Sequence, residues 1–319
     1  VMVFVNELAG ILDIPLWMKH VPADADAMTF VDVVFPAFLF IVGMSIPFAI
    51  SNREKKGDTF LRLQWHIVWR TLGLLVMGLF MVNGEGGYNE EAMGMSIRLW
   101  LLLFYVCAIL LWKVYGCQKR IWVYLLRATG GAGLCILAAV YRGGAEGTAT
   151  LTPRWWGILG LIGWAYLFAC IFFQLFRKNI VMMLVMICFC IAFYIVGKNP
   201  VIIEKEWLRW MASQAGNAAH TSIVLCGMVL SLIYFDESSI KAPGRRVAAA
   251  GIFTVLLFAA GYILRPYFGI SKIYATPSWV LYSAGICCIV FSVLYWIIDI
   301  KKISSWTRFF KPAAVNPLL

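Results

Sequence analysis

Residues 31–51 read VDVVFPAFLFIVGMSIPFAIS, and Asp32 is the one charged residue among them. A helix needs about 20 apolar residues to cross the hydrocarbon core of a bilayer, so this run is long enough to span it. The run does not alternate between polar and apolar residues, which argues against a strand of a membrane barrel. We therefore expect a transmembrane helix over residues 31–51.

The rest of the chain repeats this pattern. Hydrophobic residues make up 62% of the 319 residues and charged residues 13%, whereas a soluble domain carries about 25% charged residues. The sequence predicts further spans at 66–83, 96–115, 121–140, 156–176, 180–197, 220–235, 247–264 and 278–300. With a partial helix at each end, we expect an all-α, polytopic transmembrane bundle of about 11 helices in the full protein, nine of them complete here. We expect residues 1–319 to be a single domain, truncated at both ends.

Lysine and arginine concentrate in every second predicted loop. These loops contain 18 of the 27 Lys and Arg residues but 5 of the 16 Asp and Glu residues, and they lie at 52–70, 113–127, 177–178, 236–246 and 299–311. The positive-inside rule places them in the cytoplasm, so His20 is expected on the extracytoplasmic side. Topology thus accounts for most of the net charge of +11, and nucleic-acid binding is not expected.

The nine cysteines predict neither a structural disulfide nor a metal site. Eight of them lie inside predicted spans, where cysteine behaves as a small hydrophobic residue. The pairs Cys188/Cys190 and Cys287/Cys288 lack a histidine or carboxylate at ligand spacing. The chain also lacks Walker, GxGxxG and HExxH motifs. We therefore expect no metal.

Polar residues precede and interrupt the span at 31–51. Thr29 and Asp32 have the spacing of a helix capping box, which explains the aspartate by structure alone. Pro36 lacks an N–H and so leaves the carbonyl of Asp32, four residues earlier, without its helical donor. Pro47 does the same to the carbonyl of Gly43. The segment between the prolines, which includes Ser45, fits a packed helix seam and a ligand site equally well.

Asn6, His20 and Asp32 map to the same end of the first two helices. An amide in an apolar segment is costly unless it has a partner. His20 taken alone is explained as an anchor at the headgroups. Together, however, an imidazole, a carboxylate that fixes its tautomer and an amide are the minimum equipment for acyl transfer. We expect His20 to approach Asn6 and Asp32, and we expect Asp24 and Asp26 to be solvated, because their loop offers them no buried partner.

The segments MVFVN (2–6), KH (19–20) and TFVDVVFPAFLFIVGMSI (29–46) resemble the N-terminal signature of the heparan-α-glucosaminide N-acetyltransferase family, the lysosomal enzyme and its bacterial relatives. Weaker similarity continues in WRTLGLLVMGL (69–79) and ATPSWVLYSAGI (275–286). The resemblance implies a multi-pass acetyltransferase that moves acetyl from cytosolic acetyl-CoA to an amino sugar or glycan hydroxyl on the extracytoplasmic side. The residues after His20 differ from the family's Ala-Ser-Trp, which leaves the acceptor open.

The resemblance also implies roles for single residues. His20 would be the catalytic histidine, as a general base or as a transient acetyl carrier, with Asn6 as its companion and Asp32 as its acidic partner. Arg70 is expected to bind the CoA phosphates, and Ser45 to take part in binding the donor. The expected partners are acetyl-CoA, a sugar or glycan acceptor and the lipid bilayer of a bacterial plasma membrane. The sequence does not determine the oligomeric state, and a homodimer is one option.

Two other classes of function fit parts of the sequence. A transporter or flippase for a glycan or lipid-linked substrate would also have proline-interrupted helices and polar groups within the membrane. Against it, the chain shows no internal inverted repeat, and its spans contain few ionisable residues. A structural partner without catalysis is the third class.

Residues 204–214, EKEWLRWMASQ, have an amphipathic pattern. Trp207, Trp210 and Met211 follow the i, i+3, i+4 spacing of one helix face. The pattern predicts a helix lying on the outer membrane surface. It would be separate from the span at 220–235, with His220 at the outer end of that span.

Overall fold

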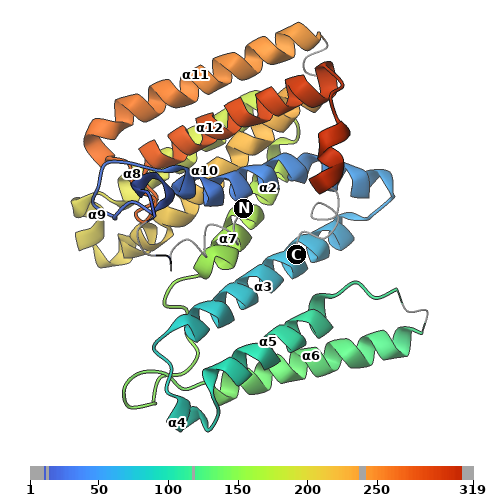
Figure 1. Cartoon of the computed structure of the whole chain (residues 1–319), viewed down its shortest axis with the longest axis vertical. Coiled ribbons are helices and arrows are strands. Elements are labelled where there is room, and N and C mark those ends of the chain that lie inside the picture. Colours follow the sequence, from blue (N-terminus) through green and yellow to red (C-terminus); the bar gives the residue numbers. More distant parts are fainter. Residues whose placement is uncertain (1–10, 12–13, 117–118, 237–241, 311–319) are drawn as a thin grey trace. The chain divides into compact units, whose positions relative to one another are not determined.

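The computed structural model describes residues 11, 14–116, 119–236 and 242–310, and these residues form helices without a β-sheet (Figure 1). The long helices are α2 (Phe30–Lys55), α3 (Phe60–Glu85), α5 (Ile97–Trp112), α6 (Arg120–Val140), α7 (Gly157–Phe176), α8 (Ile180–Gly197), α10 (Arg209–Phe235), α11 (Pro243–Phe268) and α12 (Pro277–Tyr295). The short elements are η1 (Leu16–Met18), α4 (Glu90–Met93), α9 (Pro200–Glu204), η2 (Glu206–Leu208), η3 (Trp296–Ile300) and η4 (Ser305–Phe310).

Each of the nine predicted spans corresponds to one long helix. Eight of these helices are long and apolar enough to cross a membrane, and α5, with 16 residues, is shorter. The predicted all-α, polytopic transmembrane fold is confirmed, and the chain is an integral, multi-pass membrane protein. The two partial helices expected at the ends lie outside the described residues.

The chain divides into two compact units. Unit 1 contains residues 1–56 and 168–319, and unit 2 contains residues 57–167. In unit 1, α10 is the central helix and packs against α2, α8, α11 and α12. Its side chains are buried all round from Ala219 to Tyr234, as expected for a helix enclosed by other helices.

Two glycines allow α2 and α10 to touch through their backbones. A methyl group placed on Gly43 would overlap the carbonyl oxygen of Val224, and one placed on Gly227 would overlap the carbonyl oxygen of Phe40. Because neither residue has a side chain, the two helices approach more closely than larger residues permit. Of the two explanations for the segment between the prolines, the packed seam therefore holds at Gly43.

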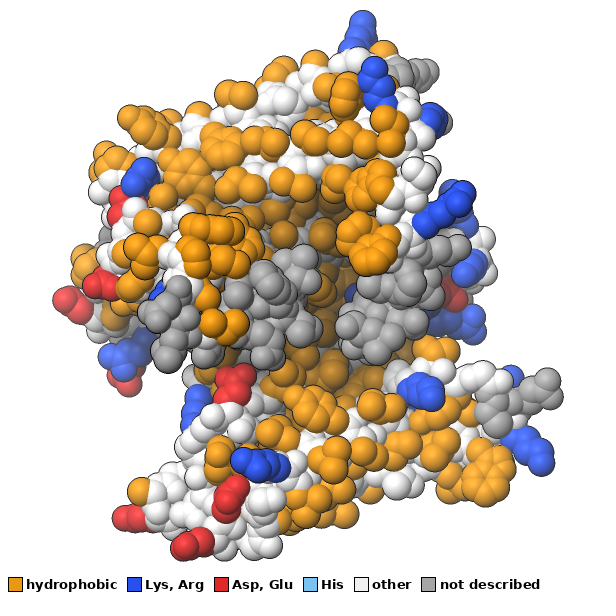
Figure 2. All heavy atoms as spheres, viewed as in Figure 1, with side chains coloured by type: hydrophobic (Ala, Val, Ile, Leu, Met, Phe, Trp, Pro, Cys, Tyr) orange, Lys and Arg blue, Asp and Glu red, His pale blue; other side chains and the backbone are white. Residues whose placement is uncertain are grey.

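The surface of unit 1 is apolar over α11 and α12. Figure 2 shows hydrophobic side chains along both helices, with Lys and Arg side chains gathered at the end where α11 begins and α12 finishes. Ile252, Val255 and Ile263 on α11 are each more than 60% exposed. Apolar side chains of this size suit contact with lipid tails, which replace the water that a soluble protein would meet.

Unit 2 has an aromatic core of its own. The ring of Phe80 on α3 stacks on Trp100 and Phe104 of α5, with centroids 5.2 and 4.9 Å away. The indole N–H of Trp100 donates to the carbonyl of Leu137 on α6 over 3.0 Å. Tyr141 follows α6 and donates its hydroxyl to the carbonyl of Asn83. The core thus ties α3, α5 and α6 together by packing and by hydrogen bonds.

The prediction for residues 204–214 is wrong. Residues 209–214 are the first turns of α10, which starts 11 positions before the predicted span at 220–235. The amphipathic pattern arises because this end of α10 keeps Trp210 exposed on one side while Ala215 on another side is buried. His220 consequently lies in the middle part of α10 and not at the outer end of a span. Its side chain is buried, and its ring packs against Phe35 and Trp279.

The glycine contact between α2 and α10 can be tested by a single methyl group. We expect Gly227→Ala to lower the free energy of unfolding by about 1–3 kcal/mol, because the added methyl has no space. Thermal unfolding of the purified protein in detergent measures the change. Gly216→Ala is the matched control in the same helix, since a methyl there meets nothing within 4 Å. Equal melting temperatures for the two variants would contradict the close contact.

Candidate functional site

The site begins with Asp32, the third residue of α2. One carboxylate oxygen, Oδ2, accepts from the backbone N–H of Thr29 at 3.1 Å and from that of Val21 at 3.4 Å. The first of these bonds belongs to the predicted capping box, which is present. Since Oδ2 is occupied in this way, the other oxygen, Oδ1, is directed to a different partner.

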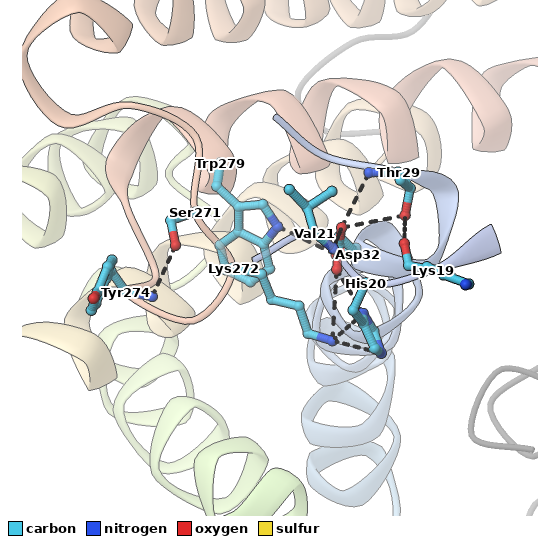
Figure 3. A network of polar contacts seen from close by, with 9 residues as sticks. All are labelled: Lys19, His20, Val21, Thr29, Asp32, Ser271, Lys272, Tyr274 and Trp279. Carbon is cyan, nitrogen blue, oxygen red and sulfur yellow. Dashed lines mark hydrogen bonds and ion pairs between the residues drawn. The ribbon is translucent and has the colours of Figure 1, made fainter. Parts of the chain in front are cut away.

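That partner is His20. Its Nδ1 lies 2.7 Å from Oδ1 of Asp32, and the aspartate side chain is 3% exposed while the histidine side chain is 41% exposed (Figure 3). A carboxylate only accepts hydrogen bonds, so this contact assigns the ring proton to Nδ1. Nε2 is then the nitrogen that can take up a proton, on a ring that ligands can reach.

Lys272, from the loop between α11 and α12, completes the cluster. Its Nζ lies 3.2 Å from Nδ1 and 3.4 Å from Nε2 of His20, and 4.0 Å from Oδ1 of Asp32. Figure 3 shows the lysine side chain reaching across Asp32 to the histidine ring, while the side chain of Lys19 points away from it. The site therefore combines an imidazole, a carboxylate and an ammonium.

Two loops far apart in sequence are joined beneath this cluster. Ser271 Oγ donates to the carbonyl of Ala23 over 2.6 Å. Asp26 accepts from Nε of Arg265 at 2.9 Å and from the backbone N–H of Ile270 at 2.8 Å. These bonds hold residues 19–29 and 269–276 at one end of unit 1, as the alternation of the loops across the membrane requires.

The backbone carbonyl that Pro36 leaves free is also occupied. Trp279, fully buried on α12, donates its indole N–H to the carbonyl of Asp32 over 3.3 Å. The proline removes the donor that a regular helix would supply, and the tryptophan replaces it from another helix. Asp32 is thus fixed through both its backbone and its side chain.

The structure brings together some of the predicted site residues. His20 and Asp32 are in contact as expected, and Asn6 lies outside the described residues. Ser45 is exposed and donates its hydroxyl to the carbonyl of Val42 in its own helix. Arg70 belongs to unit 2, where its guanidinium lies 5.0 Å from the centroid of the Tyr166 ring. The roles of Arg70 and Ser45 stay predictions.

Asp26 is exposed, as expected, but it pairs with Arg265 and accepts from the backbone N–H of Ile270, and the sequence did not predict these partners. Asp24 is exposed, as expected. Sequence reasoning missed Lys272 and Trp279. Trp279 lies within the weakly similar segment 275–286 and Lys272 lies just before it. Lys272 is also the one lysine in a short loop between two apolar helices, and these features were the available signal.

A cavity of about 420 Å³ lies at the other end of α2. Its walls come from α2, α10 and the loop between α7 and α8, and its polar lining includes Asn52, Lys55, Lys178 and Asp236. Lys178 is 3.5 Å from the buried carboxylate of Asp236. The cavity therefore joins an apolar floor to cations contributed by two of the basic segments, Lys55 and Lys178.

The family described as "Domain of unknown function (DUF5009)" matches residues 3–219. The chain belongs to this family. Heparan-alpha-glucosaminide N-acetyltransferases of Mus musculus and Homo sapiens are each 37% identical to the chain over 83 residues. This segment is 26% of the chain and 12% of each relative, so the match spans about an eighth of the relatives' length. The resemblance noted in the sequence is thus confirmed as a distant, partial relationship.

The bond between Trp279 and Asp32 gives a prediction for stability. We expect Trp279→Phe to lower the free energy of unfolding by about 1–3 kcal/mol, since it leaves the buried carbonyl of Asp32 without its donor. Chemical or thermal unfolding in detergent measures this change. The control is Trp207→Phe, at a residue that is 73% exposed. A loss no larger than that of the control would show that the bond does not matter.

Proposed function

We propose that this protein is a membrane acetyltransferase that moves acetyl from cytosolic acetyl-CoA to an amino sugar or glycan hydroxyl on the extracytoplasmic side. The observation that carries the proposal is the contact between His20 and Asp32, which leaves Nε2 able to accept a proton. An acceptor amine or hydroxyl must lose a proton as it attacks a thioester, and a positioned base accelerates this about 10²- to 10⁴-fold. The partial similarity to N-acetyltransferases agrees with this chemistry.

The position of the site supports a reaction between substrates from opposite sides. His20 lies at the end of unit 1 assigned to the extracytoplasmic face by the distribution of Lys and Arg, where an acceptor would arrive. A donor that arrives from the cytoplasm first meets the basic end. Asn6 is proposed to donate to the reacting carbonyl, and the direct and acetyl-histidine routes both use Nε2 of His20.

Label transfer tests the reaction. Purified full-length protein, incubated with radiolabelled acetyl-CoA and a panel of amino sugars, is expected to transfer label to at least one acceptor. His20→Ala should abolish transfer in protein that still folds. Asp24→Asn, at an exposed residue of the same loop, should behave as wild type. Transport of an unmodified glycan without label transfer would instead favour a transporter, and equal activity of the two variants would rule out His20 as the base.

Which cations bind the CoA phosphates is a separate question, with two candidate sites. Arg70 is one candidate, and the cavity with Lys55 and Lys178 is a second, because it combines positive charge with an apolar floor. Phosphates bind strongly to such cations through charge-assisted hydrogen bonds.

Kinetics with acetyl-CoA distinguish the two candidates. The variant that removes a phosphate contact should raise KM for acetyl-CoA about tenfold, since one charged hydrogen bond contributes about 1.5–3 kcal/mol. Arg70→Ala and Lys55→Ala are compared in the same assay, with Lys205→Ala as an exposed control. An unchanged KM in either variant excludes that residue.

A further inference from the structure

Lys272 has an unusual position for a lysine next to a carboxylate. Its ammonium is closer to the two ring nitrogens of His20, at 3.2 and 3.4 Å, than to Oδ1 of Asp32, at 4.0 Å. Similar distances to both nitrogens place the ammonium over a face of the imidazole ring, because in the ring plane it would collide with the carbon between them. The ammonium is therefore out of line with the in-plane lone pair of either nitrogen. Lys272 is therefore more than an ion-pair partner of Asp32.

The carboxylate of Asp32 is already fully engaged. Oδ1 contacts His20 at 2.7 Å, and Oδ2 accepts from Thr29 and Val21. The ammonium has three protons, and its contacts with His20 and Asp32 leave it able to donate to a ligand. The side chains of Lys272 and His20 are 29% and 41% exposed, so both can meet a ligand that enters between them.

We propose that Lys272 stabilises the oxyanion that forms when the acetyl thioester is attacked beside His20. This inference rests on the proposed acetyltransferase function. An atom that gives its proton to Nε2 lies about 3 Å from that nitrogen, and the carbon it attacks is one bond further away. The ammonium, 3.4 Å from Nε2, is therefore within reach of the oxygen on that carbon.

The chemical step on an amine acceptor balances as follows. The nitrogen lone pair forms a bond to the thioester carbonyl carbon, and the electron pair of the C=O double bond moves to the oxygen, which faces Lys272. Nε2 of His20 takes the proton from the acceptor nitrogen. The oxygen pair then re-forms the double bond, the carbon–sulfur bond breaks, and the departing sulfur takes the proton from His20. The products are the acetamide and the free thiol of CoA.

Electrostatics explains why a cation is needed here. The carboxylate that orients His20 would repel a second negative charge that develops a few ångströms away, and this repulsion is large where water is scarce. The ammonium of Lys272 offsets the charge of Asp32 before the reaction starts. The oxyanion then forms against the imidazolium and the ammonium together.

The charged and titratable groups around this loop are few among the described residues. They include His20, Asp32, the pair Asp26 and Arg265, Tyr274 of the loop itself, and Tyr194 of α8, whose hydroxyl donates to the carbonyl of Tyr274. Burial lowers the pKa of Lys272 below the ordinary lysine value, and the nearby Asp32 carboxylate partly opposes the shift. Because only the protonated amine is a cation, activity should fall as the pH rises through this lowered pKa.

Three variants test the inference in the label-transfer assay. Lys272→Met is expected to lower kcat about 10²- to 10³-fold with KM for acetyl-CoA changed little, as for removal of one oxyanion donor. Lys272→Arg should recover part of kcat and lose the decline at high pH, because arginine stays protonated. Lys205→Met, at an exposed lysine in a segment on the same predicted side, should match wild type.

The outcomes separate this inference from the function on which it rests. If wild type transfers label and His20→Ala does not, while Lys272→Met keeps full kcat, the function stands and the role of Lys272 is overturned. If Lys272→Met unfolds, Lys272→Arg decides the matter: an alkaline decline identical to that of wild type overturns the inference. Failure of wild type to transfer label, whatever the Lys272 variants do, would instead refute the proposed function.

Discussion

The end of α2 depends on one constraint, the need to satisfy every polar group of Asp32 where little water is available. Its side chain accepts from Thr29 and Val21 and contacts His20, and its carbonyl accepts from Trp279. A carbonyl without a donor inside a membrane costs several kcal/mol. The proline that removes the helical donor therefore obliges α12 to pack against α2 at this level, and the loop that precedes α12 arrives with it.

This constraint links the helix cap to the chemistry. A capping box and a catalytic carboxylate appeared as rival explanations of Asp32, yet the two oxygens divide the tasks between them. The capping bonds immobilise the carboxylate, and an immobile carboxylate holds the imidazole in one orientation and one tautomer. The structural role thus prepares the proposed catalytic one.

Much of this fold was predictable because hydrophobic length is a strong signal. All nine spans coincide with helices, and the spacing of Thr29 and Asp32 located the start of α2. The approach of His20 to Asp32 followed from two polar residues at the mouth of one apolar run. The beginning of α10 was missed, because a helix that leaves the bundle becomes amphipathic and looks like a surface element.

Lys272, Trp279 and the pairing of Asp26 were not predictable for a different reason. Each acts through a partner at least 239 positions away, and a single charge or indole in a loop has no periodicity that could reveal such a partner. Loop-to-loop contacts depend on which helices become neighbours, and hydrophobic patterns do not specify neighbours. The positive-inside rule predicted only the side of the membrane on which the two loops lie.

The long separation between the two joined loops has a consequence for biosynthesis. The bond between Ser271 and Ala23 spans 248 positions, which a ribosome covers in about 12 to 50 s at about 5–20 residues per second. During that interval α2 has been made but the Lys272 loop and Trp279 do not exist, so the carbonyl of Asp32 must be satisfied by water or by the insertion machinery. A nascent chain therefore carries its histidine without its cation, and the site is assembled only when the α11–α12 hairpin enters the membrane.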